Sequence, residues 1–264
     1  MLYTDQMQRK VEISESPQRI VSVVPSQTEL LYDLGVAHRL VGITKFCIHP
    51  NDFFLATKKI GGTKTLRLEQ IAALEPDLII ANKEENTQSD IEWLSARFPV
   101  WISDILNTSD ALNMIHEVGQ LVQAPDKAKS IIAQLSSDFE SIKALATQYP
   151  HKRVAYLIWR QPYMVAAKGT FIHEMLNLTG FTNVFAHLER YPSVSLEDLN
   201  AAAPELIFCS SEPYPFTAAH FEELQIASPK SHLQLVDGEV FSWYGTRLLH
   251  LKSYYQKVLN PLVQ

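Results

Sequence analysis

A long amphipathic stretch in the middle of the chain, from Pro125 to Tyr149, limits the folds that are available to it. Proline suits the first helical turn, Asp126 complements the positive end of the helix dipole, and Pro150 cannot continue the helix. About 23 residues at 1.5 Å each predict a rod of roughly 35 Å. Apolar residues recur every three or four positions and form one stripe, with Asp126, Asp138, Glu140 and Lys143 on a solvated opposite face. The stripe is Ala128, Ile131, Ile132, Leu135, Phe139, Ile142, Leu145 and Ala146.

The segments on either side of this stretch follow the same plan, in which strands alternate with helices. Apolar, β-branched runs predict strands at 19–24, 40–44, 77–81, 100–102 and 153–159, with helices at 88–97, 108–122, 170–178 and 246–259. Ser26 or Thr28 can cap the helix after the first strand, and Gly35 ends it. This alternation is typical of an α/β protein with parallel sheets. With 264 residues, we expect an N-terminal lobe over 1–124, a connecting helix over 125–150 and a C-terminal lobe over 151–264.

A local repeat links the two halves. The segment from Leu68-Glu69 to Leu78-Ile79 recurs 128 positions later, from Leu196-Glu197 to Leu206-Ile207, with a proline and an acidic residue before each apolar run. Both copies predict a helix, a proline turn and a strand. We interpret the repeat as an internal duplication.

Several classes of function are disfavoured by what the sequence lacks. It has no P-loop, no G-x-G-x-x-G, no G-x-S-x-G elbow and no H-E-x-x-H. We therefore predict no catalytic residues and no enzyme activity. The net charge of −6 argues against a nucleic-acid partner. Cys47-Ile48-His49 offers two metal donors, but no nearby pair completes a site, so we predict no protein-held metal and leave open whether Cys47 or His49 ever contacts one.

Aromatic residues paired with proline or arginine cluster where strands end, which is where open α/β sheets bind ligands. Large rings with a few polar tips suit a bulky, partly apolar ligand. The alternative interpretation is that these aromatic residues only cover the ends of the sheets and bind no ligand. Arg160 and Arg247 are candidate anchors for an anionic group. The clusters contain Phe46, Trp159-Arg160, Tyr191-Pro192, Tyr214-Pro215-Phe216 and Trp243-Tyr244-Gly245-Thr246-Arg247.

These residues together resemble the class III substrate-binding proteins of ABC importers. The resemblance rests on the run from Arg19 to Leu31, the glycine turn at Gly61-Gly62, Leu68-Glu69, Pro76 to Ile80 and the central helix, and it covers the chain from about residue 18. It implies two Rossmann-like parallel-sheet lobes joined by one long, rigid helix, with a cobalamin, ferric siderophore or haem ligand in the cleft between them. The ligand would bring its own metal, and no cofactor would be permanently bound.

Within this family, the cobalamin-binding members are the most similar. The resemblance places Phe46, Tyr191, Trp243 and Tyr244 at ligand-binding positions and adds Pro25 and Ser26 after the first strand. Trp159 joins them as an aromatic wall. Two departures leave the ligand class open: a family tryptophan is missing near Lys64–Leu66, and Arg160 and Arg247 favour an anionic ligand.

The same resemblance assigns Glu69 and Glu197 to docking against arginines of the importer's membrane subunits. The alternative is that each carboxylate only complements the dipole of a first helical turn. The protein is expected to be a monomer that binds a metal chelate, although the sequence does not define its oligomeric state.

The expected location depends on which observation is used. The first ten residues contain no apolar run of seven, so the sequence as it begins predicts a cytoplasmic protein. The resemblance instead predicts a periplasmic or membrane-associated one. A cytosolic carrier or sensor of a corrinoid or iron chelate, or an enzyme acting on a metallated cofactor, therefore remain as alternatives.

Overall fold

A computed structural model describes residues 1–263 and divides the chain into two compact units. Unit 1 comprises Met1–Ile105, Ser109–Gln134 and Tyr244–Arg247, and unit 2 comprises Leu106–Thr108, Leu135–Trp243 and Leu248–Gln264. A four-residue segment from late in the chain therefore belongs to the same compact unit as the N-terminal sheet.

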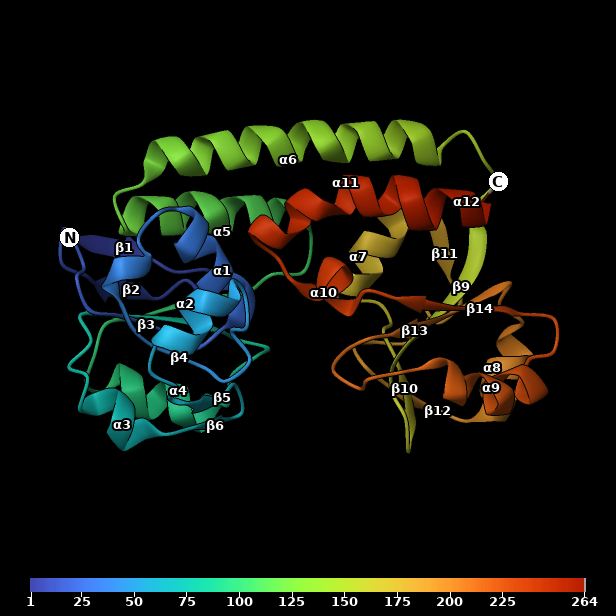
Figure 1. Cartoon of the computed structure of the whole chain (residues 1–264), viewed down its shortest axis with the longest axis horizontal. Coiled ribbons are helices and arrows are strands. Elements are labelled where there is room, and N and C mark those ends of the chain that lie inside the picture. Colours follow the sequence, from blue (N-terminus) through green and yellow to red (C-terminus); the bar gives the residue numbers. More distant parts are fainter. Residues whose placement is uncertain (264) are drawn as a thin grey trace. The chain divides into compact units, whose positions relative to one another are not determined.

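Unit 1 is built on a four-stranded parallel sheet in the order β4-β3-β7-β8. Figure 1 labels two of these strands, β3 and β4. Its strands are β3 (Ile20–Ser22), β4 (Leu40–Ile43), β7 (Leu78–Asn82) and β8 (Val100–Ser103), and nearly all of their residues are buried. Burial on both faces explains the continuous apolar runs from which these strands were predicted. Two small hairpins accompany the sheet: β1 (Leu2–Thr4) with β2 (Lys10–Glu12), and β5 (Gly61–Gly62) with β6 (Thr65–Leu66).

The helices of unit 1 are α1 (Pro25–Asp33), α2 (Asn51–Ala56), α3 (Leu68–Ala72), α4 (Gln88–Ser95) and α5 (Thr108–Leu121). The predicted cap of α1 is wrong, because the helix begins at Pro25 with Val24 as N-cap and no side-chain cap. The hydroxyl of Thr28 instead donates within the helix to the Val24 carbonyl, at 2.9 Å. Gly35, with φ of +85°, follows the helix as predicted. The sequence analysis missed α2.

Helix α6 (Pro125–Ala146) occupies the central amphipathic stretch. Its buried residues include Ala128, Leu135, Phe139 and Ile142, in agreement with the predicted stripe. In unit 1, α5 and α6 approach closely at Gly119, where an added Cβ would lie 2.4 Å from the Cβ of Ala128. The prediction that Asp138 lies on the solvated face is wrong. Asp138 is buried, and Lys252 Nζ lies 2.8 Å from its carboxylate. The rigidity of α6 and the ligand cleft expected from the sequence stay predictions.

Unit 2 contains a six-stranded mixed sheet in the order β12-β10-β9-β13-β14, with β11 also pairing with β9. The pairs formed by β9 with β13, β13 with β14 and β11 with β9 are parallel, whereas β10 is antiparallel to both of its neighbours. The strands are β9 (Lys152–Trp159), β10 (Tyr163–Val165), β11 (Phe181–Asn183), β12 (Ser193–Val194), β13 (Leu206–Ser210) and β14 (His232–Val236).

The helices of unit 2 are α7 (Phe171–Leu178), α8 (Leu196–Ala202), α9 (Phe221–Ala227) and α10 (Gly238–Ser242). The predicted helix over 246–259 is not one regular helix. It starts as a 3₁₀ turn (Thr246–His250), continues as α11 (Leu251–Tyr254), widens to a π-helical turn (Tyr255–Leu259) and ends with α12 (Asn260–Val263).

The repeat predicted from the sequence has the same local structure in both units. Helix α3 leads into β7, and helix α8 leads into β13. Glu75 and Ala203, which are 128 positions apart, both have φ of 46°, a left-handed conformation that is uncommon for residues other than glycine. Ala203 is the C-cap of α8, Glu75 lies three residues after the end of α3, and each directly precedes the proline that comes before the strand.

The hydrogen bonds around each proline turn also match. In unit 1, the Asp77 carboxylate accepts the Arg19 backbone N–H at 2.8 Å, and the Arg19 guanidinium donates to the Leu74 carbonyl at 2.6 Å. In unit 2, the Glu205 carboxylate accepts the Arg153 N–H at 3.0 Å, and the Arg153 guanidinium donates to the Ala202 carbonyl at 2.6 Å. Leu74 and Ala202 are again 128 positions apart. A chance match of common residues would not reproduce this bonding, so the duplication is structural.

Candidate ligand-binding and docking sites

In unit 1, the predicted residues Pro25 and Ser26 form the first turn of α1, directly after β3. The segment Tyr244–Arg247 lies against this turn, since a Cβ added to Gly245 would come within 3.0 Å of the Ser26 carbonyl oxygen. Gly245 has φ of +134°, which only glycine adopts readily. Tyr244 is buried, with 5% of its surface exposed. The fold therefore brings Pro25 and Ser26 into the same unit as Tyr244 and Arg247, which lie about 220 positions later in the sequence.

Arg247 is bound to a carboxylate on α1. Its Nη2 donates to Glu29 Oε1 at 2.7 Å and its Nε donates to Oε2 at 3.1 Å, a bidentate pair. Both side chains are mostly buried. Burial raises the pKa of Glu29 despite the opposing effect of Arg247. The guanidinium predicted as a ligand anchor is thus engaged within unit 1.

Phe46 lies in the loop after β4 and is 47% exposed. Its ring packs over the glycine turn, because a Cβ added to Gly62 would lie 3.2 Å from Phe46 Cε2. Lys45 Nζ lies 4.9 Å from the ring centroid. This combination gives unit 1 an exposed aromatic surface at the carboxyl end of its sheet, where the sequence predicted one.

Cys47 anchors the same loop to α1. Its Sγ lies 3.1 Å from the hydroxyl oxygens of both Thr28 and Thr44. Burial raises the pKa of the thiol, so the thiolate that a metal would require is disfavoured. Across residues 1–263, no group of three or more histidine, cysteine or acidic side chains is arranged to hold a metal ion.

A buried amide network supports this end of the unit 1 sheet, and the sequence analysis missed it. Asn82 donates to Ser103 Oγ at 3.0 Å, and Gln27 donates to the same hydroxyl. Asn86 donates to the carbonyls of Val23 and Thr63, at 3.1 Å each. It therefore ties the end of β3 to the glycine turn under Phe46. Scattered polar residues have no sequence pattern that would have identified such a network.

In unit 2, an aromatic cluster lies at the end of β9. Trp159 is 40% exposed and packs edge-on against Tyr214, with ring centroids 5.7 Å apart. Tyr214 in turn contacts Phe216 at 4.8 Å and His220 at 5.4 Å. The aromatic and proline-rich run at 214–216 marked this loop in the sequence, whereas nothing there indicated that it meets Trp159.

Arg160 follows Trp159 and forms an ion pair with Glu223 of α9. Its Nη2 and Nε both donate to Glu223 Oε2, at 2.7 and 3.2 Å. The hydrogen bond lowers the pKa of Glu223 and raises the pKa of Arg160, so the two shifts agree that both groups are charged. Glu223 is a residue that the sequence analysis did not single out, because only the fold places α9 beside the end of β9.

The two other residues of unit 2 that were predicted to contact the ligand, Tyr191 and Trp243, have other neighbours. Tyr191 is partly exposed, with Arg190 Cζ 5.7 Å from its ring centroid. Trp243 is only 8% exposed, and its Nε1 donates to Glu212 Oε1 at 2.8 Å. Their contact with a ligand stays a prediction, as it does for all the other predicted ligand-binding residues.

Glu212 provides a test of this buried arrangement through pH. Burial raises its pKa, and the nearby Glu239 and Asp237 carboxylates add to the rise. A carboxyl group with a raised pKa in the folded state favours folding below its unfolded pKa, and that stability is lost as the pH increases through the folded pKa. We expect Glu212→Gln, which keeps an acceptor for Ser242 and Trp243, to stabilise the protein at pH 7 by about 1 kcal/mol.

Urea unfolding of both proteins between about pH 4.5 and 8 measures this effect. The two stabilities should converge toward the acid end of the range, where Glu212 is protonated. Parallel pH profiles, with no change in their separation, would contradict the assignment of Glu212 as a buried, ionised carboxylate.

The predicted docking glutamates occupy equivalent places in the repeat. Glu69 lies in the first turn of α3 and Glu197 in the first turn of α8, and both are exposed. Helix α8 has a capping box, in which Ser195 and Asp198 bond reciprocally, so Glu197 is not needed as a cap.

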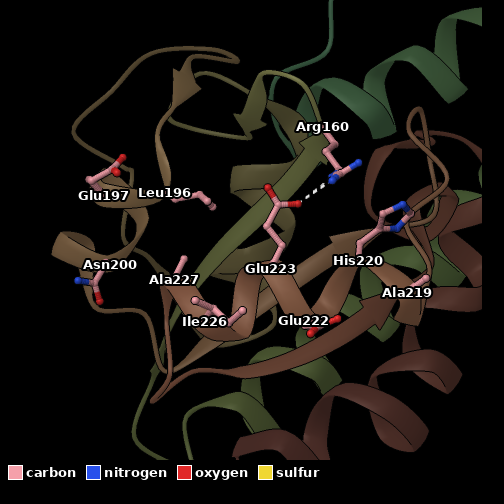
Figure 2. Close-up of a pocket in the computed structure, with 10 residues that line it drawn as sticks. All are labelled: Arg160, Leu196, Glu197, Asn200, Ala219, His220, Glu222, Glu223, Ile226 and Ala227. Carbon is pink, nitrogen blue, oxygen red and sulfur yellow. Dashed lines mark hydrogen bonds and ion pairs between the residues drawn. The ribbon is translucent and has the colours of Figure 1, made fainter.

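Glu197 also lines a surface pocket of about 560 Å³, which we name the α8–α9 pocket (Figure 2). Residues of α8, of the 3₁₀ turn Ala218–His220 and of α9 surround it, together with Arg160. Figure 2 shows Leu196, Ile226 and Glu223 between Glu197 on one side and His220 on the other.

None of the helices described for residues 1–263 is both long and apolar enough to cross a membrane.

Two α/β units, one with a parallel and one with a mixed sheet, share a duplicated helix–turn–strand element and carry aromatic residues at strand ends, which together define a two-unit binding-protein fold. The chain belongs to the periplasmic binding protein family, whose model matches residues 20–227. This match and the solved structures that resemble the chain confirm the fold class and the family predicted from the sequence.

Individual relatives show the extent of the similarity. The chain is 27% identical over 199 residues to a vitamin B12-binding protein of Vibrio parahaemolyticus, covering 75% of this chain and 72% of that protein. It resembles the periplasmic vitamin B12-binding protein BtuF of Vibrio cholerae with a TM-score of 0.78 and 21% identity, covering 90% and 95% of the two chains. Its TM-score is 0.82, with 20% identity, to the periplasmic heme-binding protein RhuT of Roseiflexus sp. RS-1, covering 94% and 99%.

Proposed function

We propose that this protein binds a metal-chelate ligand, cobalamin in the first place, and delivers it to the membrane subunits of an ABC importer from the periplasm or from a membrane-associated position. Membership of the periplasmic binding protein family is the observation that carries this proposal. Vitamin B12-binding relatives support cobalamin, and heme-binding structures of the same fold support a planar chelate in general.

The aromatic surfaces of the two units fit a ligand of this kind. Exposed Phe46 lies after β4 in unit 1, and exposed Trp159 is the last residue of β9 in unit 2. Each ring packs against neighbouring residues on one side and keeps a large part of its surface exposed. A large macrocycle with apolar faces gains from stacking on such rings. Phe46 and Trp159 are therefore proposed as contacts to the ligand.

The engagement of both predicted arginine anchors favours cobalamin over haem. Arg160 is paired with Glu223, and Arg247 is paired with Glu29. A haem has two propionate groups that seek guanidinium partners, whereas the corrin ring carries neutral amides that need only hydrogen bonds. Two arginines already neutralised by carboxylates leave less positive charge for a dianion.

A titration followed by tryptophan fluorescence and visible absorbance tests this function, with cobalamin, haem and ferrichrome as separate ligands. We expect saturable quenching by cobalamin and at least a tenfold weaker affinity in Trp159→Ala, because a tenfold change corresponds to about 1.4 kcal/mol of lost stacking. The matched control is Trp93→Ala, since Arg97 covers that ring at 3.9 Å. Haem should bind more weakly than cobalamin. No response to any of the three ligands would overturn the proposal.

A further inference from the structure

The loop after β13 places a tyrosine next to the exposed ring at the end of β9. The backbone N–H of Tyr214 donates to the Ile158 carbonyl at 3.3 Å, which fixes the loop to the end of the strand. The Tyr214 ring meets Trp159 edge-on, with centroids 5.7 Å apart, and it remains partly exposed. A planar ligand that stacks on Trp159 therefore brings its rim close to Tyr214.

The hydrogen bonds of His220 fix which of its ring nitrogens carries the hydrogen. The backbone N–H of Thr217 donates to His220 Nδ1 at 2.9 Å, so Nδ1 is an acceptor and has no hydrogen of its own. The ring is then neutral, with its hydrogen on Nε2. Because Nε2 lies 3.2 Å from the Tyr214 hydroxyl oxygen, the imidazole donates and the tyrosine oxygen accepts.

The hydroxyl hydrogen of Tyr214 is consequently directed away from His220. The Arg160 guanidinium, which can only donate, also lies near this hydroxyl: Glu223 raises the pKa of Arg160 most, and hydrogen bonding to tyrosines, Tyr214 among them, adds to the rise. No acceptor for the hydroxyl hydrogen is found in the part of the chain that the structure describes, residues 1–263. The aromatic cluster therefore presents a hydroxyl donor beside an exposed ring.

We propose that Tyr214 determines part of the ligand specificity, by donating its hydroxyl hydrogen to a carbonyl oxygen at the rim of a planar chelate that stacks on Trp159. The inference rests on the proposed function and deepens it, since it adds a polar contact to the aromatic ones. The chemistry that it selects is a chelate with neutral acceptors around its rim, such as the amide carbonyls of a corrin. A ring edge without acceptors would exclude water from the hydroxyl and offer it no partner, which disfavours binding.

Tyr214→Phe tests the proposal, because it removes only the hydroxyl and keeps the ring against Trp159. In the cobalamin titration, we expect the affinity to fall at least threefold, as for the loss of a neutral hydrogen bond. A smaller loss would overturn the proposal. The matched control is Tyr32→Phe, since the Tyr32 ring packs against Phe53 in unit 1, and its affinity should stay within twofold of that of the unaltered protein. Equal losses in the two variants would also count against Tyr214.

A spectroscopic measurement separates a contact with the ligand from a purely structural role of the hydroxyl. In protein labelled with 13C at the tyrosine Cζ atoms, the Tyr214 signal is the one that disappears in Tyr214→Phe. We expect this signal to shift at saturating cobalamin, because Cζ carries the hydroxyl oxygen, whereas the Tyr32 signal should stay in place. A Tyr214 signal that does not move would overturn the proposal.

Failure of this inference is distinct from failure of the proposed function. If the unaltered protein binds cobalamin and Tyr214→Phe binds it equally well, only the assignment of Tyr214 is wrong. If the unaltered protein does not bind cobalamin, the proposed ligand is wrong and the inference falls with it.

Discussion

Replacing Arg247 by methionine is expected to lower the free energy of unfolding at pH 7 by about 3 kcal/mol, because breaking a buried ion pair leaves one charge without compensation. The two side chains are only 14% and 12% exposed, which leaves little water to solvate the abandoned carboxylate. Methionine preserves most of the volume of the stem, so the lost interaction is mainly electrostatic. Urea unfolding followed by far-UV circular dichroism measures the change.

The pH dependence identifies Glu29 as the cause. Its folded pKa is already raised, and loss of Arg247, which lowers it, raises it further. The destabilisation should therefore be small near about pH 4.5, because the raised folded-state pKa leaves the carboxyl mostly protonated in the folded state of both proteins, and it should grow as the pH increases toward neutrality. A loss that is independent of pH would contradict this explanation.

A second variant separates charge from packing. Glu29→Gln in the Arg247→Met background removes the unpaired charge, so it should recover more than half of the lost stability at pH 7. If the double variant is as unstable as Arg247→Met, the ion pair is not what holds the segment Tyr244–Arg247 to α1.

Reversing both predicted docking charges, with Glu69→Arg and Glu197→Arg together, should weaken binding to importer membrane subunits in lipid nanodiscs at least tenfold. Under the predicted docking role, each substitution would replace an attractive contact with an arginine by a repulsive one, and a tenfold change corresponds to only about 1.4 kcal/mol in total. Both side chains are exposed on the first turn of a short helix, so the change should not disturb the fold.

The control is a protein with the same change in net charge at other exposed sites, Glu12→Arg with Glu140→Arg. Binding is expressed per ligand-loaded molecule, so that a change in ligand affinity is not mistaken for a change in docking. If the control weakens binding as much as the double docking variant does, net charge rather than the two positions governs the association.

The strands and the repeat could be predicted from the sequence because both depend on residues that are close to one another along the chain. Continuous apolar runs such as 19–24 and 77–81 have few conformations that bury every residue, and a parallel strand is one of them. The proline turns recur because an acidic residue after the proline and an arginine close matching hydrogen bonds in each unit, as Asp77 with Arg19 and Glu205 with Arg153 do.

The errors arose where a partner from far along the chain changes the surroundings of a residue. Asp138 lies on what the helical period marks as the solvated face, yet it is buried against Lys252, which is 114 positions away. Arg247, whose role as a ligand anchor stays a prediction, is likewise paired by the fold with a residue far along the chain, Glu29, which is 218 positions away. The spacing of apolar residues and the preferences of residues for helix or strand contain no information about partners so far away in the sequence.

By itself, the sequence determined the fold class, the family, the duplicated element and the exposed aromatic residues Phe46 and Trp159, because hydrophobic period and turn residues act over a few positions. Only the tertiary structure decided which charges are neutralised and which remain available. It paired Arg160 with Glu223 and left Glu197 exposed beside Ile226. The energy of a charge depends on burial and on neighbours a few ångströms away, and the folding of distant segments against one another sets both.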